Sequence, residues 1–235
     1  MIIYGRNAVR ESLKADNVSK LFVLSRFQND PLTKFALENK VIVKFVDEAE
    51  LTRMTRNPSH QGFAAIVGDF KTLELDELIK SINSKYPLIL MLDGIEDPHN
   101  LGAIIRSVDA LGVDGIIIKS RGEVQLNETV AKVSTGAINW VKVAKVNNLS
   151  RAIEKLKDNG YWIVSSDGEA KQSYDSIDYK CPICLVVGSE GFGISRLVKE
   201  KSDFLVKIPM YGHVNSMNAS VSAAILLSQI VISRK

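Results

Sequence analysis

The chain has few cysteines and prolines, no long unbroken apolar run and no strong excess of charge of either sign. Its 235 residues include 2 cysteines and 6 prolines, and 30 basic residues stand against 27 acidic ones for a net charge of +3. That small excess permits nucleic acid binding but does not indicate it. The longest apolar tract, residues 221–232, is broken by serine and glutamine and is too short to cross a bilayer. Because no secretory signal opens the chain, we expect a cytoplasmic protein without membrane contact.

The two cysteines do not point to a redox or metal site. Cys181 and Cys184 form a C-P-I-C motif that leads into the strand-like run CLVVG, whereas a redox pair usually opens a helix. Zinc would need two further ligands, and the 3 histidines are scattered along the chain. We therefore interpret both cysteines as inert core thiols and expect no metal.

Short β-branched runs alternate with helical stretches, which is typical of an α/β protein. The rhythm changes at Pro87, so we expect a small domain at 1–68, a linker at 69–86 and a second domain at 87–235. The apolar strands of the second domain predict a mostly parallel sheet covered on both faces. The expected strands are 21–24, 41–46, 62–70, 88–92, 115–119, 141–146, 161–166, 183–187 and 204–209. The expected helices are 31–40, 75–84, 101–111, 127–136, 149–159, 194–201 and one from about 218.

Ligands of such sheets bind beyond the carboxyl ends of strands, so the loops after 88–92, 183–187 and 204–209 are candidate sites. The first loop leads into DPHNLGAIIRS (97–107). On a helix that starts near Leu101 the large apolar side chains share one stripe, and Arg106 lies opposite them. Its neighbours one turn away are glycine and alanine, where a solvent-facing helix usually carries long charged side chains. This spacing predicts free room around the guanidinium.

The second loop, VVGSEGFGIS (186–195), is glycine-rich but matches no common nucleotide-binding or nucleophile motif. It lacks the last glycine of G-x-G-x-x-G, the lysine of a phosphate-binding loop and the spacing of G-x-S-x-G. Glu190 stands among its small residues, without other charges beside it. The carboxylate could serve a ligand site or simply stabilise the start of the next helix.

The third loop opens the stretch IPMYGHVNSMNASVSAA (208–224). Ser216 or Asn218 could cap the final helix, which is the ordinary explanation for both residues. That helix is apolar around most of its circumference, so we expect the sheet to bury one side and a partner subunit another. His213 and Asn215 have no assigned role.

The three stretches, in this order, resemble the three motifs of the SpoU-type RNA ribose 2′-O-methyltransferases of the SPOUT superfamily. The resemblance runs from Pro87 to the C-terminus. The stretches YGRNAVRESL (4–13) and HQGFAAIV (60–67) extend it to the N-terminal domain, which is similar to the family's ribosomal-protein-like RNA-binding module. The branch that methylates a guanosine ribose in bacterial 23S rRNA is the most similar.

The resemblance implies a C-terminal α/β domain with a trefoil knot, S-adenosyl-L-methionine held in the knot, and an active site shared across a homodimer. It also implies RNA as substrate and no metal. By position, the implied catalytic residues are Asn100, Arg106, Glu190, Ser216 and Asn218. The implied cofactor-binding residues are Gly188, Ile208 and Met217, the last at a position where the family often has leucine.

The implied reaction is attack of a ribose 2′-oxygen on the sulfonium methyl group, which depends on alignment and on stabilising negative charge. A guanidinium stays protonated, so we expect Arg106 to fix a phosphate and stabilise the developing alkoxide, with the proton passing to that phosphate. Three alternatives stay open, namely the same reaction on tRNA, an RNA-binding module without catalysis, and an oxidoreductase with a nucleotide cofactor. RNA contacts are expected from the N-terminal module, where the candidates, each equally explained as a solvated charge, are Arg6, Arg10, Arg53 and Arg56.

Overall fold

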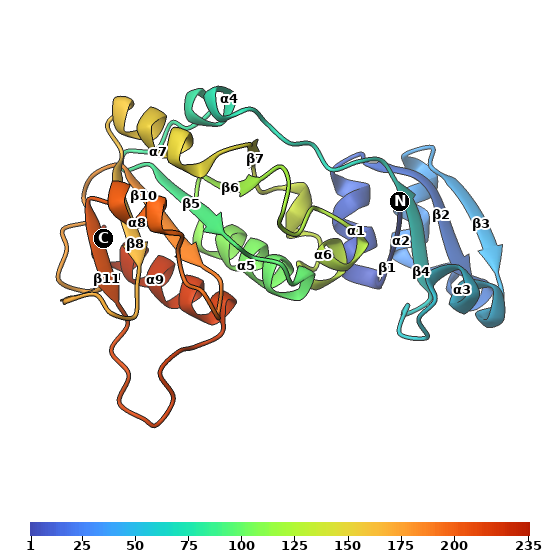
Figure 1. Ribbon diagram of the computed structural model, residues 1–235. Coiled ribbons are helices and arrows are strands. Elements are labelled where there is room, and N and C mark those ends of the chain that lie inside the picture. Colours follow the sequence, from blue (N-terminus) through green and yellow to red (C-terminus); the bar gives the residue numbers. More distant parts are fainter. The chain divides into compact units, whose positions relative to one another are not determined.

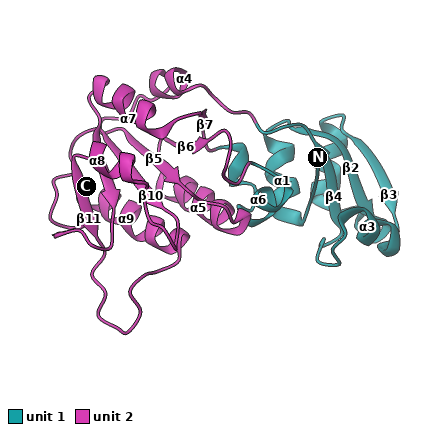
Figure 2. Ribbon diagram, viewed as in Figure 1, with its two compact units in different colours: residues 1–70, 126–140 teal, residues 71–125, 141–235 magenta.

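The computed structural model describes all residues from 1 to 235 and divides into two compact units, coloured separately in Figure 2. Unit 1 comprises residues 1–70 and 126–140, and unit 2 comprises residues 71–125 and 141–235. Residues 126–140, expected within the C-terminal domain, thus pack with the N-terminal part of the chain. None of the helices has both the length and the apolar character that spanning a bilayer requires.

Unit 1 is built on a four-stranded sheet in the order β1-β4-β2-β3, in which only β2 and β3 run parallel. Asp30 caps the helix that follows it, where Pro31 occupies the first helical position, and Asp47 caps the next helix in the same way. The elements are β1 (Ile2–Tyr4), α1 (Arg6–Lys14), β2 (Val18–Leu24), η1 (Ser25–Phe27), α2 (Pro31–Glu38), β3 (Ile42–Val46), α3 (Glu48–Thr55) and β4 (Phe63–Val67). Of these, β1, α1 and α3 are not among the elements expected from the apolar pattern, because they are short or largely polar.

The inserted segment adds α6 (Glu128–Val133) and η2 (Ala137–Asn139) to unit 1. Lys132 Nζ donates to the Tyr4 hydroxyl at 3.0 Å and lies 4.3 Å from the centre of that ring. Asn139 Nδ2 donates to Ser12 Oγ at 3.1 Å. Gly136 has a φ of +95°, and a Cβ there would lie 2.4 Å from Cβ of Glu11, so this close approach requires glycine.

Unit 2 contains a seven-stranded, fully parallel sheet in the order β7-β6-β5-β10-β8-β11-β9, which confirms the expected sheet type (Figure 1). Its first elements are α4 (Leu75–Lys80), β5 (Leu88–Asp93), α5 (Pro98–Leu111), β6 (Gly115–Lys119), β7 (Val143–Val146), α7 (Leu149–Asp158) and β8 (Trp162–Ser166). The remaining ones are β9 (Gln172–Ser173), β10 (Ile183–Gly188), α8 (Arg196–Lys201), β11 (Phe204–Lys207) and α9 (Ala219–Ser233).

Helices cover both faces of this sheet. Helices α5 and α9 pack against each other on one face, whereas α4, α7 and α8 contribute their buried side chains to a core cluster on the other. Part of the expected linker at 69–86 packs against the rest of unit 2. Leu75 and Leu78 of α4 join that core cluster, and Leu73 forms a β-bridge with Ala144 of β7. Both faces of the central strands are therefore buried, as their near-continuous apolar runs indicate.

Several details of unit 2 differ from the expectations, among them the two-residue strand β9, which the apolar pattern did not predict. Helix α5 begins at Pro98, one turn before Leu101, because the Asp97 side chain accepts a hydrogen bond from the backbone N–H of His99 at 2.8 Å and proline fits the first helical position. Cys184 lies in the core as expected, but Cys181 is only half-buried. Burial raises the pKa of both thiols, which is typical of unreactive cysteines.

The strand order reverses between β5 and β10. From β5 the chain adds β6 and β7 on one side, and the strands on the other side begin with β10. Such a switch point leaves a crevice beyond the carboxyl ends of the strands. The loops after β5 and β10 therefore start side by side, which brings the first and second motifs together. The trefoil knot implied by the resemblance stays a prediction.

Candidate active site

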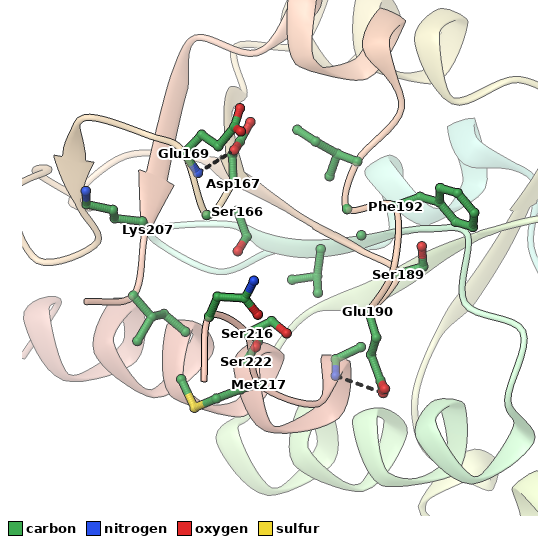
Figure 3. A pocket seen from close by; sticks show the side chains of 18 of the residues that line it. Ser166, Asp167, Glu169, Ser189, Glu190, Phe192, Lys207, Ser216, Met217 and Ser222 are labelled. Carbon is green, nitrogen blue, oxygen red and sulfur yellow. Dashed lines mark hydrogen bonds between the residues drawn. The ribbon is translucent and has the colours of Figure 1, made fainter. Parts of the chain in front are cut away.

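A cavity of about 950 Å³ opens at the carboxyl ends of β8, β10 and β11 (Figure 3). Its walls come from the loops that follow these three strands and from the start of α9. Five of the residues singled out in the sequence line it, namely Gly188, Glu190, Ile208, Ser216 and Met217. The position agrees with the rule that parallel sheets bind ligands beyond their carboxyl edge.

The loop after β8 contributes two carboxylates that lie outside the three motifs. Asp167 and Glu169 both line the cavity, and the backbone N–H of Glu169 donates to Asp167 Oδ1 at 2.8 Å. Burial alone would raise the pKa of Asp167, but its hydrogen bond and ion pair with Lys199 lower it overall. The signal that could have revealed this loop is its place after the apolar strand-like run YWIVSS, with Gly168 marking a turn.

The second motif forms a loop that turns back on itself, and this requires glycine at position 188. Ser189 and Gly193 exchange backbone hydrogen bonds of 3.1 and 2.9 Å. A Cβ on Gly188 would lie 2.1 Å from the carbonyl carbon of Gly193, far inside any permitted contact. Glycine at this position therefore allows the two arms of the loop to pack closely against each other.

Three residues, one from each motif, meet at the edge of the cavity. Glu190 Oε1 accepts hydrogen bonds from Asn100 Nδ2 at 2.9 Å and from Asn218 Nδ2 at 2.6 Å. Asn218 Nδ2 also donates to Asn100 Oδ1 at 2.9 Å, which closes a triangle. Residues as far apart as 100 and 218 are thus joined through one carboxylate, and we call this group the Asn100–Glu190–Asn218 triangle.

The triangle is anchored at the start of α9. Asn218 is its N-cap and accepts from the backbone N–H of Ser220 at 2.9 Å, so of the two capping candidates Asn218 is the cap and Ser216 is not. The backbone N–H of Ala219 donates to Glu190 Oε1 at 3.3 Å, drawn as a dashed line in Figure 3. Glu190 therefore lies at the N-terminus of α9, where the helix dipole stabilises an anion, and not at the next helix along the chain.

Arg106 lies apart from this group within its own chain. It is exposed, forms no hydrogen bond or ion pair and does not line the cavity. It follows Asn100 by six residues on α5, which places it roughly 9 Å further along the axis and on a different side of the helix. Gly102, which was expected to leave room beside the guanidinium, is buried. Ala103 and Ala110 are not buried, and their short side chains leave the surface near the guanidinium uncovered.

The site combines apolar side chains, exposed backbone and charged groups of both signs. Ile208, Met217 and neighbouring aliphatic residues offer apolar contact, and the exposed backbone of the glycine loop offers hydrogen bonds. Asp167 and Glu169 supply negative charge, and Lys199 and Lys207 supply positive charge, with Asp167 and Lys199 paired. A concave site that combines apolar contacts with convergent polar groups is typical of cofactor sites.

Comparison with known proteins agrees with this geometry. Residues 87–228 match the SpoU rRNA Methylase family, and residues 2–73 match the family described as RNA 2′-O ribose methyltransferase substrate binding. A relative from Staphylococcus saprophyticus, described as a TrmH family tRNA/rRNA methyltransferase, is 44% identical over 98% of this chain and 94% of its own length.

Solved structures share the fold over the whole chain. A crystal structure of an RNA 2′-O ribose methyltransferase is 27% identical, with a TM-score of 0.84 over 100% of this chain and 88% of its own. The SpoU methyltransferase AviRb from Streptomyces viridochromogenes, solved with the cofactor AdoMet, is 20% identical, with a TM-score of 0.84 over 100% of this chain and 90% of its own. The chain therefore belongs to the SpoU rRNA methylase family.

Proposed function

We propose that the protein methylates the ribose 2′-oxygen of a guanosine in 23S rRNA, with S-adenosyl-L-methionine as methyl donor. The observation that carries the proposal is the Asn100–Glu190–Asn218 triangle, in which all three motif loops converge on the rim of one cavity. The RNA substrate makes the cytoplasm the expected place of action.

The cavity suits the cofactor in size and in chemistry. Its volume, about 950 Å³, lies within the range of small-molecule sites and leaves room for part of a nucleotide as well. Gly188, Ile208 and Met217 are the proposed cofactor contacts, with Asp167 and Glu169 placed to meet hydroxyl or ammonium groups. When bound, S-adenosyl-L-methionine supplies an electrophilic methyl group, so the protein needs to align the acceptor oxygen and stabilise its charge.

The residues of the motifs divide these tasks. Glu190 fixes the amides of Asn100 and Asn218, which holds the loops at the orientation that alignment requires. The Ser216 hydroxyl, exposed and on the cavity wall, is free to bind the ribose. Arg106 would hold a phosphate of the RNA by its planar donors and stabilise the alkoxide, and the 2′-hydroxyl proton would pass to that phosphate.

Because Arg106 does not line the cavity of its own chain, we propose that a second copy supplies it, in a homodimer with shared active sites. Helix α9 supports a dimer because it is apolar around its circumference, with Val221 and Ile232 exposed by 45% and 61%. Large apolar side chains in such a position are typical of a face that another subunit covers.

The N-terminal part is the proposed RNA-binding domain, residues 1–68, joined through 69–86 to a catalytic domain at 87–235. Arg6 donates two hydrogen bonds of 2.8 Å to Asp30, and Arg10 pairs with Glu11, so both are already engaged. The two remaining candidates, Arg53 and Arg56, are exposed and make no ion pair. We therefore propose these two as phosphate contacts.

The test is methyl transfer from tritiated S-adenosyl-L-methionine to 23S rRNA transcripts and to tRNA, followed by digestion to nucleosides. We expect label in 2′-O-methylguanosine from the rRNA. Label in tRNA would support the alternative substrate, and cofactor binding without any labelled RNA would support a binding module. Mapping 2′-O-methyl sites in total RNA from cells with and without the gene would then identify the nucleotide.

A further inference from the structure

An ion-pair cluster with two buried carboxylates lies outside the cavity lining and outside the three motifs' implied site residues. Lys119, at the end of β6, places Nζ 2.9 Å from Glu123 Oε1 and 3.9 Å from Asp93 Oδ1. The Glu123 side chain is 2% exposed and that of Asp93 6%. The hydrogen bond from Lys119 to Glu123 is the main reason that the pKa of Lys119 is raised, so the lysine stays charged. We call these three residues the Lys119 cluster.

Each carboxylate of the Lys119 cluster also holds the backbone of a motif loop. Glu123 Oε1 accepts from the N–H of Gly94, the first residue after β5, at 2.7 Å. Asp93 Oδ2 accepts from the N–H of Ser195, at the far end of the glycine loop, at 2.6 Å. Lys119 therefore lies between two carboxylates that hold the first and second motifs, within hydrogen-bond distance of Glu123 and 3.9 Å from Asp93.

The path from the Lys119 cluster to Glu190 is short. Gly94 has a φ of +83°, and a Cβ there would lie 3.4 Å from Cβ and Oγ of Ser189, so no more than a methyl group fits between Gly94 and the side chain of the residue before Glu190. The N–H of Val124 adds a second tie, donating to the carbonyl of Ile95 at 3.0 Å. A shift of Gly94 would thus be passed to the loop that presents Glu190.

We propose that Lys119 and Glu123 are positioning residues for methyl transfer, which set the geometry of the Asn100–Glu190–Asn218 triangle by holding Gly94 and, through Asp93, Ser195. The proposal rests on the proposed function. The buried carboxylates of Glu123 and Asp93 accept from backbone N–H groups, and a hydrogen bond to a charged acceptor is shorter and stronger than one to a neutral group. Lys119 supplies the positive charge that pairs with these carboxylates. An error of about 1 Å in a reacting geometry can lower a rate by roughly a hundredfold.

Glu123→Gln tests the proposal because glutamine keeps an oxygen for the Gly94 N–H and removes the charge that attracts Lys119. We expect kcat to fall on the order of tenfold, with the affinity for S-adenosyl-L-methionine by calorimetry changed less. Hydrogen–deuterium exchange of residues 189–195 should become faster, whereas a general loss of stability would speed exchange throughout the chain. The matched control is Glu154→Gln, which breaks the exposed pair between Glu154 and Lys201 and should leave kcat unchanged.

The neutral triple variant Lys119→Met, Glu123→Gln and Asp93→Asn controls for misfolding, because it removes all three charges of the Lys119 cluster and leaves none of them buried without its partner. If the three charges act as a unit, the kcat of the triple variant should be no lower than that of Glu123→Gln alone. Rates within twofold of wild type for both variants would overturn the inference while leaving the proposed function intact. If the wild-type chain neither binds the cofactor nor methylates RNA, the proposed function itself fails.

Discussion

The substitution Asn218→Asp separates the role of this residue in the active site from its role in the fold. Aspartate keeps the side-chain oxygen that accepts from the N–H of Ser220, so α9 keeps its cap, and a negative charge at a helix N-terminus is favourable. The amide, however, is replaced by a carboxylate oxygen 2.6 Å from Glu190 Oε1 and 2.9 Å from Asn100 Oδ1. The change therefore removes two hydrogen bonds and adds a repulsion within the triangle.

The expected magnitude follows from these contacts. A hydrogen bond to a charged group contributes about 1.5–3 kcal/mol. Two like charges about 4 Å apart repel by roughly 1 kcal/mol in water and roughly 4 kcal/mol at an effective dielectric constant of 20. A loss of about 3 kcal/mol in the transition state corresponds to a fall in kcat on the order of a hundredfold. The thermal midpoint should also fall, and further for aspartate than for a neutral capping residue, because the repulsion acts in the folded chain while the cap is retained.

The assay is methyl transfer at saturating RNA and cofactor, with the thermal midpoint measured on the same preparations. Asn218→Ser is the matched control, since serine caps helices about as well as asparagine and adds no charge, so we expect a smaller loss, on the order of tenfold. Wild-type kcat for Asn218→Asp would refute the reasoning, as would a fall in thermal midpoint as large for serine as for aspartate.

Three further predictions concern single residues. Arg106→Lys should have a free energy of unfolding within about 0.5 kcal/mol of wild type in denaturant titration, because an exposed unpaired residue contributes little stability. The same variant should lose activity at saturating RNA, because lysine lacks the planar donors of the guanidinium. Gly188→Ala should abolish cofactor binding by calorimetry, because its Cβ would lie 2.1 Å from the carbonyl carbon of Gly193; ordinary affinity would contradict the loop geometry. Asp167→Asn should have a lower free energy of unfolding than wild type at pH 7, and the difference should disappear as the pH falls below about 4. The reason is that the pKa of Asp167 is lowered in the folded state, so its stabilisation is lost when the carboxylate is protonated. A constant difference across denaturation curves from pH 7 to pH 2 would exclude that ion pair as the cause.

Much of unit 2 could be predicted from the sequence because its strands are buried on both faces and its motifs lie at strand ends. The parallel sheet and helices α5, α7 and α9 are confirmed close to their expected bounds. Helix α5 starts one turn early because an N-cap and a following proline, Asp97 and Pro98, determine its first residue, whereas the apolar stripe begins only at Leu101.

The candidate site was only partly predictable. Sequence pattern and resemblance identified Asn100, Glu190 and Asn218, but a linear sequence does not show that their side chains bond to one another. The role of the loop after β8 depends on strand order, since β8 lies beside β10 only after a crossover. Likewise, Glu123 matters through Gly94, 29 positions away, and no local pattern marks such a contact.

The most direct test of the account is a crystal structure of the full chain with S-adenosyl-L-methionine bound. We expect the cofactor between Gly188, Ile208 and Met217, with its methyl group on the side of Glu190 and with Arg106 of a second copy facing the same opening. A cofactor bound elsewhere, or Arg106 remote from the cavity in every copy, would contradict the proposal that three loops and a second subunit together form one methyl-transfer site.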